Sequence, residues 1–72
     1  MDITALVEIF ERSKRNCLFY ESKGKKVSLL NEIGVLRGVA YCMEALTGYI
    51  PVEDKEFMRL IAIQNEAKTQ EG

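Results

Sequence analysis

The lysine-rich turn at residues 23–28 carries the clearest chemistry in the sequence, which is anion binding. Lys23, Lys25 and Lys26 precede Ser28, whose hydroxyl we expect to cap the helix that follows. Free N–H groups and the dipole at a helix N-terminus attract phosphate, and the ring of Tyr20 could stack on a base. The turn therefore allows binding of a nucleotide or another phosphorylated ligand, although lysine–glycine turns are more commonly ordinary solvated connections.

The chain lacks the side chains on which common catalytic and metal sites depend. Its 72 residues include no histidine, so a serine or cysteine nucleophile would have no usual base. A zinc site would have to rely on carboxylates, which is unusual for structural zinc. No phosphate-binding loop, dinucleotide-binding glycine motif, HExxH or CxxC occurs. We therefore predict that the protein is not an enzyme and uses no metal or cofactor.

Two cysteines, Cys17 and Cys42, lie within helical apolar patterns. In an antiparallel hairpin that turns near residues 24–26, Cys17 would lie beside about residue 33, and Cys42 would lie roughly 13 Å further along. That separation is too long for a disulfide. We predict two reduced, buried thiols and a cytoplasmic location. The acidic N-terminus does not resemble a signal peptide, and no uncharged apolar run approaches the roughly 20 residues that span a bilayer.

Residues 28–47 form the most apolar stretch and predict a central helix. At about 100° per residue it carries three stripes. The first holds Leu29, Ile33, Leu36, Ala40 and Met43; the second holds Val35, Val39, Cys42 and Leu46; the third holds the small residues Gly34, Gly38 and Ala45. A helix that is apolar or small on nearly every side is usually buried on more than one side.

The small-residue stripe predicts a close helix–helix contact, either within the chain or between two copies. A glycine in a helix interior costs up to about 1 kcal/mol relative to alanine, so two of them four residues apart favour close approach of another backbone. Arg37 and Glu44, two turns apart on one side, would form a polar rim with Tyr41. The candidate interface is therefore Gly34, Arg37, Gly38, Tyr41 and Ala45; the alternative is that surface glycines are simply tolerated here.

Glu32 projects into the apolar arc of the central helix. A lone carboxylate is costly to bury, so we expect Glu32 either to reach solvent or to pair with Lys14 or Arg15 of the preceding helix. With no histidine or metal beside it, Glu32 is a poor candidate for catalysis.

Shorter signals define the flanking helices. Residues 2–22 predict a first helix with Asp2 as its N-cap. Its seam contains Ile3, Leu6, Phe10, Ser13, Cys17 and Tyr20. A third helix is predicted over 51–67, starting at Pro51. Its inner face holds Phe57, Leu60, Ile61 and Gln64, and a frayed tail follows at 68–72. The expected fold is a single all-α domain, residues 1–67, in which a long antiparallel hairpin packs with a shorter helix.

The size and charge of the chain limit its possible functions. So small a core contributes only a few kcal/mol, which favours stabilisation by a homo-oligomer, most simply a dimer. Residues 12–37 carry a local net charge of +5 in a chain of net charge −1, a polarised surface too modest for nucleic-acid binding. We expect an interaction module, of a size that suits a bacterial or phage regulator, that regulates or inhibits a protein partner. The alternative is a phosphate-ligand binder at the basic turn; a DNA-binding regulator is a weaker third reading, and no membrane association is expected.

Overall fold

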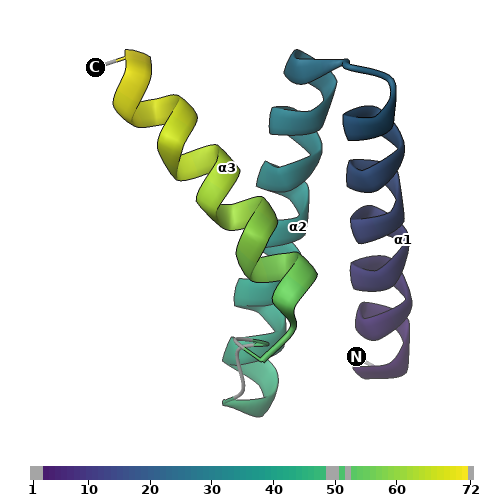
Figure 1. Cartoon of the computed structure of the whole chain (residues 1–72). Helices are drawn as coiled ribbons and strands as arrows, with labels where there is room; N and C mark the ends of the chain where they lie inside the picture. The colour runs from purple at the N-terminus through teal and green to yellow at the C-terminus, as the bar shows by residue number, and fades with distance from the viewer. Residues whose placement is uncertain (1–2, 49–50, 52, 72) are drawn as a thin grey trace.

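Three α-helices make up the chain in the computed structural model, which describes residues 3–48, 51 and 53–71, with the backbone alone for 69–71. The helices are α1 (Ile3–Ser22), α2 (Lys26–Thr47) and α3 (Lys55–Glu71). In Figure 1, α1 and α2 run side by side as an antiparallel hairpin, while α3 rises from the open end of the hairpin and diverges from α2 toward the C-terminus. The predicted all-α fold with a long helical hairpin is confirmed.

The core lies along the line where α1 meets α2. The buried residues of α2 are those of its first stripe, Leu29, Ile33, Leu36, Ala40 and Met43. From α1 they meet Leu6, Phe10 and Cys17, and from α3 they meet Phe57 and Leu60. The rings of Phe10 and Phe57 pack at a centroid distance of 5.4 Å, which brings the start of α3 onto the hairpin. The spacing of apolar residues thus identified most of the facing seams of the three helices; the exception is Ile3, which was assigned to the seam of the first helix and is exposed.

The two polar residues that interrupt these seams satisfy each other. Ser13 is buried at 3 % exposure, and its hydroxyl donates a 2.8 Å hydrogen bond to Oε1 of the half-buried Glu32. Asn16 adds a longer contact of 3.4 Å to the same oxygen. Glu32 stays partly exposed, as one of the two expectations had it. Its hydrogen bonds come from Ser13 and Asn16 and not from Lys14 or Arg15, so the expected pairing with a cation was wrong.

The first turn is tighter than the sequence indicated. Gly24 takes a positive φ of 69°, as expected for the residue after a helix, and α2 starts directly afterwards. Its N-cap is Lys25, with no side-chain capping bond, and the Leu29 N–H already donates to the Lys25 carbonyl at 2.9 Å. The prediction that Ser28 caps this helix was wrong, since Ser28 lies inside its first turn. At the other end Gly48, at a φ of 73°, ends the helix as predicted.

Helix α3 begins later and ends later than predicted. Its start is set by Asp54, whose Oδ1 accepts a hydrogen bond from the Phe57 N–H at 3.1 Å. Pro51 is buried before the helix, and its carbonyl accepts from the Asp54 N–H at 3.2 Å, so the predicted start at Pro51 was wrong. No glycine or proline follows before Gly72, and the helix continues past the expected end at Ala67 to Glu71. The expected cap at Asp2 lies outside the described residues.

Polar side chains fix α3 to α1 at two levels. The Lys14 ammonium contacts Asp54 Oδ2 at 2.7 Å, so the residue that caps α3 also anchors it to α1. Burial would raise the pKa of Asp54, but hydrogen bonds from Lys14 and the Phe57 amide, with the charge of Lys14, outweigh it and hold the pKa below its usual value. Arg59 binds Glu21 through two hydrogen bonds of 2.7 and 2.8 Å, and this bidentate contact lowers the pKa of Glu21.

Candidate interaction surface

One side of α2 is left uncovered by the rest of the described chain. We call it the outer face of α2; its exposed residues are Gly34, Val35, Gly38, Tyr41, Cys42, Ala45 and Leu46. Tyr41, Val35 and Leu46 keep 52 %, 51 % and 56 % of their surface accessible. The face contains no charged side chain. An uninterrupted apolar helix face of this kind marks an interaction site more often than isolated exposed apolar residues do.

The exposure of this face corrects the prediction that the central helix is buried on more than one side. Helix α1 covers the first stripe, and α3 reaches only the edge of α2 that carries Arg37. Val39 is partly buried against the core, whereas the rest of the second stripe faces outward. A single hairpin can cover one seam of each helix, so the second seam of α2 has no cover within the described chain.

The two glycines of the outer face are not required by packing within the chain. A Cβ added at Gly34 would meet only Gln64 Nε2, at an ordinary distance of 3.8 Å, and one added at Gly38 would meet no described atom within 4 Å. Neither glycine is therefore explained by a close approach of α3. Whether a second copy approaches them stays a prediction.

Arg37 forms a fixed polar edge beside the outer face. Its Nε donates to the Tyr41 hydroxyl at 2.9 Å, and its Nη1 donates to Gln64 Oε1 on α3 at 3.1 Å. The guanidinium also lies over the Tyr41 ring, 5.6 Å from its centroid. Glu44 is exposed two turns further along α2 and has no ion pair within the described residues. The structure thus brings together the predicted residues Arg37 and Tyr41, and it leaves Glu44 free.

The two cysteines occupy opposite environments, although both are free. Cys17 is fully buried at 0 % exposure, and desolvation, with the nearby carboxylates of Glu32 and Glu21, raises its pKa to about 11. Cys42 is exposed on the outer face of α2. The prediction of two buried thiols was therefore wrong for Cys42, because the stripe that carries it faces away from both α1 and α3.

The basic turn is exposed to solvent. The three lysines Lys23, Lys25 and Lys26 are exposed, and the Lys23 ammonium lies 5.8 Å from the centroid of the Phe19 ring. Tyr20 packs edge-on against Phe19 at 5.7 Å between ring centroids. The side chains of Lys23 and Tyr20 thus contact the Phe19 ring.

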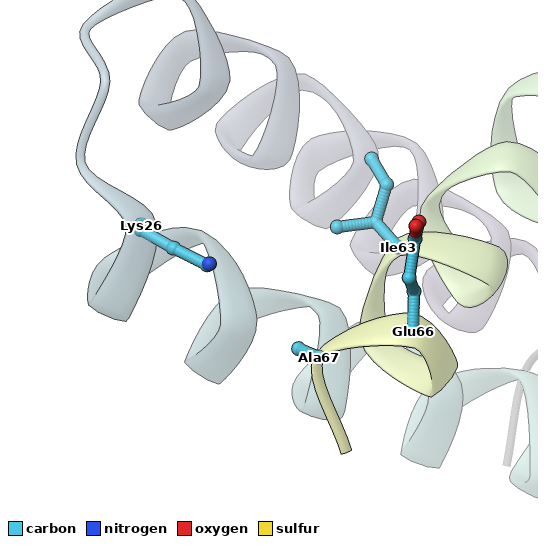
Figure 2. A pocket seen from close by; sticks show the side chains of 4 residues that line it. All are labelled: Lys26, Ile63, Glu66 and Ala67. Carbon is cyan, nitrogen blue, oxygen red and sulfur yellow. The ribbon is translucent and has the colours of Figure 1, made fainter. Parts of the chain in front are cut away.

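A shallow hollow of about 200 Å³ lies next to this turn, between the start of α2 and the second half of α3. Figure 2 shows Lys26 on one side and Ile63, Glu66 and Ala67 on the other. Of the five residues predicted to bind an anion, all of which are described, Lys26 alone lines it. The carboxylate of Glu66 lies on the wall opposite Lys26, and a carboxylate at that place opposes the binding of phosphate.

Val35, Cys42 and Leu46 are the surface residues that sequence reasoning missed, because it assigned their stripe to the interior. Their 3-and-4 spacing was a visible signal, but spacing alone does not say whether a seam is covered by the same chain or by another. Among the described residues no group of carboxylates and thiols is arranged to hold a metal ion. None of the described helices has an apolar stretch long enough to span a bilayer. Comparisons with protein-family models, curated proteins and solved structures found no match for this chain.

Proposed function

We propose that the protein is a small, non-catalytic interaction module that works in the cytoplasm as a homo-oligomer and regulates or inhibits a protein partner. The observation that carries the proposal is the outer face of α2, an uncharged helix surface with three large side chains about half exposed. The sequence, with no histidine and no recognised catalytic motif, supports binding rather than catalysis as the activity.

The outer face can contribute enough free energy to drive association. Complete burial of a valine or leucine side chain is worth about 1.5–3 kcal/mol. Val35 and Leu46 are about half exposed, so each has roughly 1 kcal/mol still to gain from burial. In a symmetric dimer both copies contribute, and the total then offsets part of the entropic cost of association.

A second exposed apolar surface is available for the protein partner. Ile3 and Val7, one turn apart on α1, keep 39 % and 41 % of their surface accessible. They lie on α1 rather than α2, so a partner bound there would not compete directly with contacts made by the outer face of α2. A homo-oligomer could therefore present two copies of this α1 surface at once.

The two other functions are less well supported. A phosphate-ligand binder needs convergent donors around a pocket, whereas the three lysines are exposed and Glu66 faces Lys26 across the hollow. A DNA-binding regulator needs a basic, polar recognition helix, and the outer face of α2 has no charged residue.

Sedimentation analysis and native mass spectrometry of Leu46→Lys test the proposal. The matched control is Val7→Lys, which places the same charge at a similarly exposed valine on α1. We expect the parent and Val7→Lys to self-associate and Leu46→Lys to be monomeric, because a lysine within an apolar contact is desolvated without a counter-charge. The tagged parent and Val7→Lys should then be compared for proteins that co-purify from the native host. A monomeric parent that captures no protein would refute the proposal.

A further inference from the structure

We propose that α2 pairs in antiparallel orientation with α2 of a second copy, about a two-fold axis that passes beside Ala40 and Tyr41. The inference rests on the homo-oligomer of the proposed function and adds its surface, orientation and register. Three features of α2 carry it: the symmetric spacing of its uncovered seam, the charges along one edge, and the small residues between them.

The uncovered part of the seam is symmetric when α2 is turned end for end. Its large exposed side chains, Val35 and Leu46, lie on one side of α2 and are equally far from the point between residues 40 and 41. When the axis passes through that point, Val35 lies opposite Leu46 of the second copy. In a two-fold interface this contact occurs twice, so both exposed aliphatic side chains meet an apolar one.

The charged edge of α2 fits the same register. Arg37 and Glu44 lie on one side of the helix, seven residues apart, and are symmetric about the same point between residues 40 and 41. In an antiparallel pair related by a two-fold axis, the same edge of both helices meets, so Arg37 lies opposite Glu44 of the second copy. Arg37 is already oriented by Tyr41 and Gln64, and Glu44 has no ion pair within the described residues. In a parallel two-fold pair this edge would instead face the opposite, apolar edge of the second helix, and Arg37 would have no carboxylate to meet.

Between the seam and the charged edge, α2 carries small side chains. Gly38 and Ala45 are exposed, and no described atom lies within 4 Å of a Cβ built on Gly38. A helix from another molecule can therefore approach α2 closely at this point without displacing any described part of the chain to which α2 belongs. The occupant must itself be uncharged in the middle and carry opposite charges on one edge, and a second copy of α2 meets both requirements.

A charge-reversal series tests the register. We expect Arg37→Glu and Glu44→Arg each to weaken the dimer about tenfold or more, because each variant replaces two opposite-charge contacts by two like-charge contacts. The double variant Arg37→Glu/Glu44→Arg should restore the dimer to within about threefold of the parent, since it only exchanges the members of each pair. Arg37 and Glu44 are too far apart along one helix to compensate each other within a chain, so rescue reports a contact between copies.

Cys42 gives an independent measurement that does not depend on the Arg37 contacts to Tyr41 and Gln64. Cys42 is exposed and lies beside the two-fold axis, so a short bifunctional thiol reagent should join the two copies of the parent at this residue. The control variant Cys42→Ala/Val7→Cys carries its exposed thiol on α1 instead and should stay largely uncrosslinked under the same conditions.

The outcomes separate this inference from the proposed function. A monomeric parent at the highest attainable concentration overturns both the dimer described here and the homo-oligomer. A dimer that shows no rescue in the double variant and no crosslink at Cys42 overturns the register while leaving the homo-oligomer in place. Rescue together with crosslinking supports the pairing of α2 with α2.

Discussion

The hydrogen bond between Ser13 and Glu32 offers a direct test of how the hairpin tolerates polar residues in its seam. Replacing Ser13 by alanine removes the 2.8 Å bond to the Glu32 carboxylate and leaves only the 3.4 Å contact from Asn16. A hydrogen bond to a charged group is worth about 1.5–3 kcal/mol. Because Glu32 is only half-buried and water can replace part of the bond, we expect Ser13→Ala to lower the free energy of unfolding by about 1–2 kcal/mol.

The matched experiment is a double-mutant cycle with Glu32→Leu, measured by urea denaturation at a protein concentration low enough to keep the chain monomeric. A chain of 72 residues has a total stability of roughly 4–11 kcal/mol, so the change is large enough to resolve. The double variant Ser13→Ala/Glu32→Leu should be close to the parent, since both polar partners are removed together. Additive losses in the two single variants, with no coupling in the double variant, would refute the reasoning.

Four further expectations concern other parts of the chain. Asp54→Ala should lower the free energy of unfolding by about 1–3 kcal/mol in thermal melts, because it removes the cap of α3 and the anchor to Lys14; Glu53→Ala, its exposed neighbour, is the control. The pKa values of Asp54 and Glu21 are lowered in the folded chain, so the stability they contribute should be complete above about pH 5 and lost as the pH falls through the folded pKa values, which acid titration of the unfolding transition would show. At a concentration low enough to keep the chain monomeric, a thiol reagent should label Cys42 within minutes and Cys17 only on the timescale of unfolding, as mass spectrometry of timed samples would reveal; equal rates would contradict the burial of Cys17. Calorimetric titration with mono-, di- and cyclic nucleotides should give no heat for the parent or for a Lys23, Lys25 and Lys26 to glutamine triple variant, and saturable binding lost in the variant would favour the phosphate-ligand function.

The spacing of apolar residues predicted the fold because it reports which side of each helix is suited to burial. Leu29, Ile33 and Leu36 were assigned to the hairpin seam and are buried. The same spacing could not show whether Val35 and Cys42 are buried or exposed, since a periodic pattern gives the direction of a side chain but not what lies in that direction. The seam was visible in the sequence, whereas its exposure depended on how far α3 reaches across α2.

Local capping was harder to predict than packing. Serine is a common N-cap residue, but the turn at Gly24 is so short that α2 starts at Lys26, before Ser28. In the sequence, Asp54 is one of three acidic residues, with Glu53 and Glu56, that all suit the start of a helix. Its hydrogen bond to the Phe57 N–H and its contact with Lys14 depend on the relative positions of α1 and α3, which no local pattern contains.

The divergence of α3 from α2 has a consequence for how the chain opens. The fully buried apolar residues of α3, Phe57 and Leu60, lie in its first half, and its ion pairs with α1, at Asp54 and Arg59, also involve that end. Toward the C-terminus α3 diverges from the hairpin (Figure 1), and in its second half Ile63 and Ala67 are only partly buried. Backbone amides in the second half of α3 should therefore exchange with solvent through local unwinding, while those in its first half exchange only when the hairpin itself unfolds. The protein would thus lose its last helical turns without losing the surface of α2.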